Sequence, residues 1–214
     1  MFAIGRRNLL LGVAGAAMLA ACNNAGGSGA ASPDDMVIGQ ANAPATLIEY
    51  ASSTCPHCAH FHETVFAQLK QNYIDTGKIK YVFREYPTPP EAIAVAGFQL
   101  ARCGGASSDQ YMNRVGELFR QQRDIFASGT MEGVRAKFVE IGGAAGLSEE
   151  QVMSCITDQS GADRIRRTVE NANRQFNITG TPTLILNGRK LEDPSAVTYE
   201  GLSHIIDQEL AAHH

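Results

Sequence analysis

The motif Cys55-Pro56-His57-Cys58 stands between an apolar segment and a segment of helical periodicity. The residues before it, 45–51, read Ala-Thr-Leu-Ile-Glu-Tyr-Ala and are typical of a buried strand. The residues after it repeat apolar side chains at helical spacing, namely Phe61, Val65, Phe66, Leu69 and Tyr73. A strand, a tight turn and a helix are therefore expected in succession, which restricts the chain to folds that place two thiols at a helix N-terminus.

The two sulfurs in this motif are expected to have unequal surroundings. Cys55 precedes the helix, where free backbone N–H groups and the helix dipole stabilise a thiolate, whereas Cys58 lies one turn further in. Pro56 suits the first helical position because its missing N–H costs nothing there. His57 adds a hydrogen-bond donor or a positive charge beside Cys55. The motif predicts a pair of thiols in which Cys55 attacks and Cys58 resolves, with a disulfide that is easily reduced.

A metal site is the alternative use of such a motif. A structural zinc needs about four ligands, and no second CxxC or HxxxH follows at a usual spacing. His57, His60 and His62 are close in sequence, but His60 and His62 lie on opposite flanks of a helix that begins at Pro56. We therefore expect no metal or other cofactor, and we expect His60 and His62 to be ordinary surface or boundary residues.

Residues 1–21 have the layout of a secretory signal peptide. Arg6-Arg7 precede an apolar run from Leu9 to Ala20, which is too short for a membrane span of about 20 residues. The run ends in Leu-Ala-Ala-Cys22, which resembles the lipid-attachment site of bacterial lipoproteins. This resemblance implies a lipidated Cys22 and a periplasmic, membrane-anchored protein. A cleaved signal in which Cys22 has no role is the alternative, and both Sec and twin-arginine export fit the two arginines.

Residues 22–35 are expected to form the anchor and a flexible tether, because they are rich in Gly, Ala, Ser and Asn. Residues 36–214 are enough for one well-packed domain, and we find no internal repeat or second linker. The formal net charge of −4 argues against nucleic-acid binding. We expect a monomer.

The order of elements in this domain is predicted as βαβ, a block of helices and then ββα. Residues 79–84 predict a strand parallel to 45–51, and Val37-Ile38 a short edge strand. Helical patterns follow from Glu91 to about Phe176, with an inserted all-helical part at about 90–160. Asn187-Gly188 predicts a hairpin. An amphipathic helix closes the chain.

These features together resemble the DsbA-like thiol–disulfide oxidoreductases, which have an α/β, thioredoxin-like fold with an inserted helical subdomain. The resemblance covers about residues 45–210 and rests on Cys-Pro-His-Cys after a strand and on Gly-Thr-Pro-Thr before a late strand. It implies that Cys55 attacks, that Cys58 resolves and that Pro182 is a cis-proline beside the disulfide. Thr181 would then offer its backbone to a bound peptide strand. An ordinary trans bond before Pro182 is the alternative.

Glu49 lies six residues before Cys55, at the position of a buried acid in this fold. The resemblance implies a carboxylate that accepts the proton released by Cys58 during resolution. A strand-edge acid paired with a nearby cation is an equally open interpretation.

Cys103 and Cys155 lie near the ends of predicted helices. An exported protein with an even pair of cysteines left over usually joins them, and the chain-entropy model gives such a bridge about 4 kcal/mol. A structural disulfide is therefore expected. Separate buried thiols and a second redox couple are the alternatives.

The resemblance implies an extracytoplasmic oxidase that introduces disulfides into unfolded or reduced exported proteins. Reoxidation would come from a DsbB-type membrane quinone reductase. The best-known oxidases of the family carry valine before the cis-proline, whereas isomerases often carry threonine, as at Thr181. An isomerase or reductase supplied by a DsbD-type partner is therefore the alternative within this fold, and a copper- or zinc-handling lipoprotein is the alternative from another class.

Overall fold

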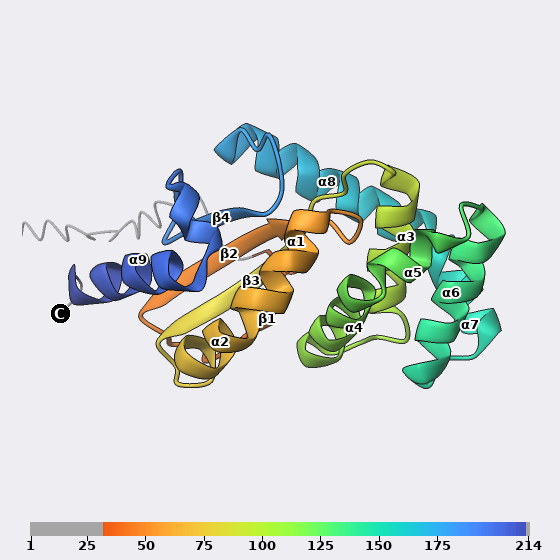
Figure 1. Ribbon diagram of the computed structural model, residues 1–214, viewed down its shortest axis with the longest axis horizontal. Coiled ribbons are helices and arrows are strands. Elements are labelled where there is room, and N and C mark those ends of the chain that lie inside the picture. The colour runs from red at the N-terminus through yellow and green to blue at the C-terminus, as the bar shows by residue number, and fades with distance from the viewer. Residues whose placement is uncertain (1–31, 213–214) are drawn as a thin grey trace, which may run out of the picture.

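The computed structural model describes residues 32–212, so the expected signal peptide and Cys22 lie outside the described residues. A five-stranded mixed sheet lies beside a group of helices (Figure 1). Its strands, in chain order, are β1 (Met36–Ile38), β2 (Ala45–Ala51), β3 (Ile79–Glu85), β4 (Thr183–Leu186) and β5 (Arg189–Lys190). Their spatial order is β1-β3-β2-β4-β5, which places β2 in the middle.

The pairing of β2 and β3 is parallel, as the sequence predicts, whereas β1, β4 and β5 each join the sheet antiparallel. The connection between β2 and β3 is one helical stretch with two π-helical segments. Its parts are α1 (Pro56–Phe61), η1 (His62–Phe66), α2 (Ala67–Leu69) and η2 (Lys70–Ile74). The predicted βαβ unit is confirmed, and its helix begins directly at the cysteine motif.

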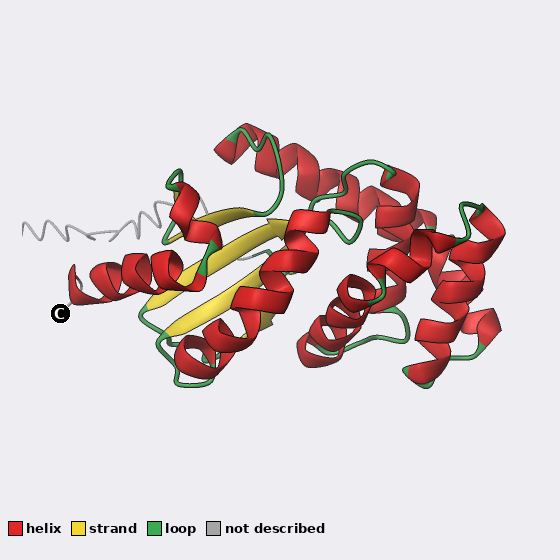
Figure 2. Cartoon of the chain, viewed as in Figure 1, coloured by secondary structure: helices red, strands yellow, loops and turns green. Residues whose placement is uncertain are grey.

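Helices occupy most of the chain between β3 and β4 (Figure 2). They are α3 (Glu91–Arg102), α4 (Ser108–Arg120), α5 (Gln122–Ala127), α6 (Met131–Ala144), α7 (Glu149–Ile156) and α8 (Gln159–Phe176). Ser107 and Ser148 each form a capping box at a helix start, which satisfies backbone N–H groups that would otherwise lack partners. The expected helical insertion is therefore present, and α8 continues beyond it to residue 176.

The chain ends with the predicted hairpin and helix. Asn187 and Gly188 connect β4 to β5 with φ angles of 47° and 81°, the left-handed values that a tight hairpin turn requires. A 3₁₀ turn, η3 (Pro194–Val197), leads into α9 (Tyr199–Ala212). Within residues 32–212, no helix is both long and apolar enough to span a membrane.

Alternation along the strands separates two faces of the sheet. Ile48 and Tyr50 of β2 pack with Ala172 and Phe176 of α8 on one face. Leu47 and Ala51, which alternate with them, belong to the larger core that includes residues of α1, α4 and α9. Because Glu49 lies between Leu47 and Ala51 in this alternation, its carboxylate faces the helix that carries the cysteines.

A buried carboxylate, Glu85 at the end of β3, connects the sheet to the inserted helices. Its Oε1 accepts hydrogen bonds from Arg102 Nε at 2.8 Å and from the Tyr111 hydroxyl at 3.1 Å. Its Oε2 accepts from Arg164 of α8. Glu85 is 1% exposed, so these donors replace the water that its charge would otherwise require.

A disulfide between Cys103 and Cys155 joins the end of α3 to α7, with the two Cα atoms 5.6 Å apart. The two residues are separated by 52 positions in sequence. The bond therefore closes a long loop within the inserted helices, away from the Cys55 motif.

Glu85→Gln should lower the free energy of unfolding by about 3 kcal/mol, because it leaves two partly buried guanidinium groups without their anion. Urea unfolding followed by circular dichroism measures this loss. Lys137→Ala is the control, because Lys137 forms only an exposed pair with Glu140, and its unfolding midpoint should match that of the wild type. Equal midpoints for Glu85→Gln and Lys137→Ala would contradict the role given to Glu85.

Replacing Cys103 and Cys155 together by serine should lower the free energy of unfolding by about 4 kcal/mol, since the unfolded chain regains the freedom of a long loop. Urea unfolding of the reduced double variant and of the wild type, with Cys55 and Cys58 alkylated in both, isolates this bond. An unchanged midpoint would show that the bond adds no stability.

Candidate active site

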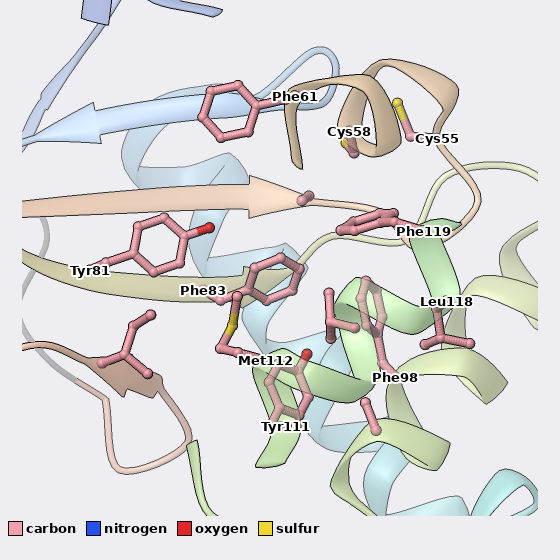
Figure 3. Close-up of a cluster of buried hydrophobic side chains, with 14 of the residues drawn as sticks. Cys55, Cys58, Phe61, Tyr81, Phe83, Phe98, Tyr111, Met112, Leu118 and Phe119 are labelled. Atoms are coloured by element: carbon pink, nitrogen blue, oxygen red, sulfur yellow. The ribbon is translucent and has the colours of Figure 1, made fainter. Parts of the chain in front are cut away.

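Cys55 and Cys58 lie at the start of α1, directly after the carboxyl end of β2 (Figure 3). Cys55 is the N-cap residue, with extended backbone angles of φ −83° and ψ 119°, and Pro56 follows in the first turn. Both thiols are free, Cys55 is 8% exposed and Cys58 is fully buried. The sulfur nearer to solvent is therefore the one at the helix end.

The loop between β2 and the motif is held by buried polar side chains. Ser52 Oγ and Thr54 Oγ1 lie 3.0 Å apart, and Thr54 Oγ1 donates to the Thr88 carbonyl at 2.9 Å. The Thr88 N–H donates back to Ser52 Oγ at 3.0 Å. This closed set of hydrogen bonds fixes the loop to the segment that follows β3.

Gln122 at the start of α5 also holds this loop. Its Nε2 donates to the carbonyl oxygens of Ser53 at 2.9 Å and of Cys55 at 3.2 Å, and the side chain is buried. The inserted helices therefore contact the backbone of the attacking cysteine directly.

The environment of Cys55 favours its thiolate. Together these surroundings lower the pKa of Cys55 from 9.0 to about 5, and the largest single cause is a hydrogen bond from the Cys58 thiol. The backbone N–H groups of His57 and Cys58 act in the same direction, whereas partial burial opposes them. Cys55 is therefore a thiolate at neutral pH.

The environment of Cys58 favours its neutral thiol. Burial raises the pKa of Cys58 far above its usual range, and the hydrogen bond to Cys55 and the negative charge of Glu49 raise it further. At neutral pH one sulfur of the pair is charged and the other is protonated. This division is what a dithiol needs if one sulfur attacks and the other resolves.

Thr181 and Pro182 lie beside Cys55. Their peptide bond is cis, and the Thr181 carbonyl oxygen is 3.3 Å from Cys55 Sγ. Within residues 32–212, the Thr181 N–H makes no hydrogen bond, and the buried Thr181 Oγ1 has no partner. The backbone next to the sulfur therefore has pairing capacity that the described chain does not use.

Glu49 is fully buried in β2, which is hydrogen-bonded to β3 on one side and to β4 on the other. Glu49 therefore does not lie at a strand edge, but it is paired with a neighbouring side chain that can carry a positive charge, His62. Its Oε2 accepts hydrogen bonds from the Tyr81 hydroxyl and from His62 Nε2, the latter at 3.2 Å. Its Oε1 has no partner within the described residues.

His62 is a boundary residue, as the sequence suggested, but its imidazole is turned inward and its side chain is only 6% exposed. The imidazole ring lies 4.6 Å from the Phe66 ring and 4.5 Å from the Phe119 ring, measured between centroids. Phe119 belongs to α4, and Figure 3 shows it beneath the helix that carries the two cysteines. His60, two residues earlier on the opposite flank, is exposed as expected.

Pro56 and His57 are both exposed at the tip of the motif. The imidazole of His57 makes no hydrogen bond or ion pair with the part of the chain that the structure describes. Its backbone N–H, rather than its ring, acts on the Cys55 thiolate. In the same range, no three His, Cys, Asp or Glu side chains lie together in an arrangement that could hold a metal ion.

Three residues contact this site without having been assigned to it from the sequence: His62, Tyr81 and Gln122. Tyr81 lies in the predicted strand 79–84, and nothing in the spacing of Glu49 and His62 indicates their contact. Gln122 is an ordinary polar residue of a helix by sequence. The pairing of β2 with β3 brings Tyr81 to Glu49, α4 packs against α1 and η1 beside His62, and Gln122 reaches the loop before α1 from the start of α5.

Comparison with known proteins identifies a matching family model and relatives whose names agree with it. A family model described as thioredoxin matches residues 31–208. A Rickettsia typhi protein, provisionally named a protein-disulfide oxidoreductase, is 34% identical over 183 residues, covering 83% of this chain and 62% of that protein. The chain thus spans about three fifths of the length of the curated relative.

Among solved structures, alpha-DsbA1 of Wolbachia pipientis superposes with a TM-score of 0.74 at 26% identity, covering 86% of this chain and 94% of that one. A second curated relative, disulfide bond formation protein D of Bacillus subtilis, is 21% identical in sequence over 81% of this chain and 76% of its own length. These similarities confirm the predicted fold class, a thioredoxin-like fold with inserted helices.

Alkylation of Cys55 by iodoacetamide should stay fast at neutral pH and slow as the pH falls through about 5, where the thiolate takes up a proton. Because the folded-state pKa is depressed, the thiolate stabilises the reduced fold above the unfolded pKa near 9.0, and this stability is lost as the pH falls to about 5. Absorbance at 240 nm of the Cys103→Ser/Cys155→Ser variant measures the titration. A midpoint near 9 would contradict the geometry described for Cys55.

Proposed function

Because this chain belongs to the DsbA-like proteins of the thioredoxin family, we propose that it catalyses thiol–disulfide exchange on other proteins, with Cys55 and Cys58 as its redox pair. The observation that carries the proposal is the division of charge between the two thiols at the start of α1. Cys55 is a thiolate beside the unpaired N–H of Thr181, and Cys58 is a buried neutral thiol.

In the proposed reaction a substrate thiolate attacks Cys55 Sγ of the Cys55–Cys58 disulfide. A substrate–Cys55 disulfide forms, the bond to Cys58 breaks, and the Cys58 sulfur takes up a proton. A second substrate thiolate then attacks the substrate sulfur and releases Cys55 as a thiolate. The substrate loses two electrons and two thiol protons and gains a disulfide, and the enzyme is left reduced.

The direction we propose is oxidation of the substrate. The reduced enzyme is stabilised by every interaction that lowers the pKa of Cys55, and stabilising the reduced form makes the disulfide a stronger oxidant. Thr181 before the cis-proline favours the second candidate, an isomerase or reductase of the same fold.

Thr181 and Pro182 form the proposed docking site for an extended substrate segment. The unpaired N–H of Thr181 suits main-chain hydrogen bonding, which accepts any sequence able to extend beside Cys55. Pro56 and His57, exposed at the tip, would contact the same segment, and Glu49 is the proposed proton acceptor for Cys58.

We place the protein outside the cytoplasm, with residues 1–21 as signal peptide, Cys22 as lipid anchor, 22–35 as tether and 36–214 as the functional domain. Reduced exported proteins are its proposed substrates. A DsbB-type quinone reductase is its proposed oxidant, or a DsbD-type reductant if the direction is reversed. These assignments rest on the sequence motifs and on the resemblance to DsbA-like proteins.

The equilibrium redox potential of the Cys55–Cys58 pair tests the direction. In glutathione buffers, with Cys103 and Cys155 replaced by serine, we expect a value well above the approximately −270 mV of thioredoxin, because the Cys55 thiolate is stabilised. A value near or below that of thioredoxin would favour the reductase. Absence of exchange together with retained copper or zinc would favour the metal-handling alternative.

Cys58→Ser should accumulate mixed disulfides between Cys55 and substrate proteins, because the resolving sulfur is missing. Non-reducing electrophoresis of the variant mixed with a reduced, unfolded protein would detect them. Cys55→Ser is the matched control and should trap nothing. Equal trapping by both variants would show that Cys55 is not the attacking residue.

A further inference from the structure

We propose that His62 is the proton-transfer residue that connects Glu49, and through it Cys58, to solvent. This inference rests on the proposed function, because it concerns the proton that Cys58 gains and loses in each exchange. Neither the resemblance nor the sequence pattern assigns His62 a role. Its hydrogen bond to the buried carboxylate of Glu49 is the observation that does.

The two oxygens of Glu49 have different surroundings. Oε2 accepts hydrogen bonds from Tyr81 and His62, whereas Oε1 is buried without a partner in the described residues. Glu49 and Cys58 are both fully buried, on the face of β2 that α1 covers, so neither side chain reaches solvent directly. The negative charge of Glu49 also raises the pKa of the Cys58 thiol. In the proposed path Glu49 exchanges a proton with Cys58 through the free Oε1 and with His62 through Oε2.

Glu49 itself has no contact with solvent, since it is fully buried. A proton taken from Cys58 must pass to another group before Glu49 can act again. Tyr81 does not suit this purpose, because burial and the charge of Glu49 raise the pKa of its hydroxyl well above the usual range. Tyr81 therefore remains a neutral donor that orients the carboxylate.

His62 is the other partner of that carboxylate, and it lines a groove of about 840 Å³ between α1 and the helices α4 and α5. Nε2 faces Glu49, while Nδ1 makes no hydrogen bond with the described residues. An imidazole can take up a proton on one ring nitrogen as it gives one from the other. His62 lies between a buried acid and a groove open to solvent, so it can carry a proton from one to the other.

The rings of Phe66 and Phe119 hold the imidazole in this position. The titratable groups that face His62 are Glu49 from β2, Tyr81 from β3 and Cys58 from α1. The groove adds His60 and Glu63 on the same helix, Arg120 at the end of α4, paired with Glu117, and Arg123 on α5. Of these groups, only Glu49 is hydrogen-bonded to His62.

The proton balance follows the exchange reaction. When a substrate thiolate displaces Cys58, the electron pair of the broken S–S bond stays on Cys58 Sγ, which takes a proton from protonated Glu49. That proton reaches Glu49 from His62, which takes one from water in the groove in its place, so Glu49 is left as the carboxylate of the reduced protein. Reoxidation of the enzyme runs the same transfers in the opposite direction.

The test is the rate of single-turnover oxidation of a dithiol peptide by the oxidised protein, measured by rapid acid quench between about pH 5 and 8. Each variant's rate is divided by the wild-type rate at the same pH, so that the ionisation of the peptide thiols cancels. His62→Gln keeps a donor for Glu49 but cannot relay a proton, and we expect it to be slower by about tenfold or more. His60→Gln, exposed on the same helix, should match the wild type.

A double-mutant cycle separates a relay from a structural effect. Because His62 acts through Glu49, Glu49→Gln/His62→Gln should be no slower than Glu49→Gln alone, within about twofold. The titration of Cys55 at 240 nm should be the same in His62→Gln as in the wild type. Additive losses in the cycle, or a wild-type rate for His62→Gln, would overturn the proposal.

If His62→Gln fails to fold, as judged by urea unfolding, His62→Phe replaces it in the same cycle with the same expectation. Phenylalanine keeps the contacts with Phe66 and Phe119 but has no ring nitrogen. If the wild-type protein shows no thiol–disulfide exchange with the peptide, the proposed function is overturned, and this inference with it. Normal wild-type exchange with a fully active His62 variant would overturn the inference alone.

Discussion

The hydrogen bonding of β2 between β3 and β4 is the constraint on which the site depends. Because β2 is central, its carboxyl end delivers Cys55 to the start of α1, and alternation along it directs Glu49 to the same face. The antiparallel register pairs Tyr50 with Thr183, so the Thr181–Pro182 bond arrives beside Cys55. One strand therefore positions the attacking sulfur, the buried acid and the proposed substrate-binding backbone.

The site combines features that are unfavourable in isolation. A carboxylate without solvent contact and a thiolate with little of it both carry a desolvation cost. The chain offsets this cost locally, through the hydroxyl of Tyr81 and the ring of His62 for Glu49 and through Cys58 and helix N–H groups for Cys55. The same groups that make burial tolerable thereby set which sulfur carries charge and where protons can leave.

The sequence predicted the fold and the pair of cysteines well because both depend on local patterns: an apolar strand, a CxxC at a helix start, and Asn-Gly in a hairpin. The parallel pairing of β2 and β3 and the block of helices agree with those patterns. The surroundings of Glu49 were not predictable in this way. Its contacts with His62 and Tyr81 come from separate elements, and the exposure of His62 depends on how α4 packs over η1. Hydrophobic periodicity reports the local structure of one segment and does not show which distant segments pack together.

Gln122 gives the inserted helices a part in the chemistry of a strand-helix turn to which they are not adjacent in sequence. Its amide donates to two carbonyl groups of the loop that ends at Cys55. The backbone conformation of this loop therefore depends on the inserted helices as well as on the sheet. A chimera that kept the sheet but received helices without a donor at the position of Gln122 would therefore leave the Ser53 and Cys55 carbonyl groups without this partner. In this architecture the inserted helices support the backbone of the reactive cysteine as well as forming part of the outer surface.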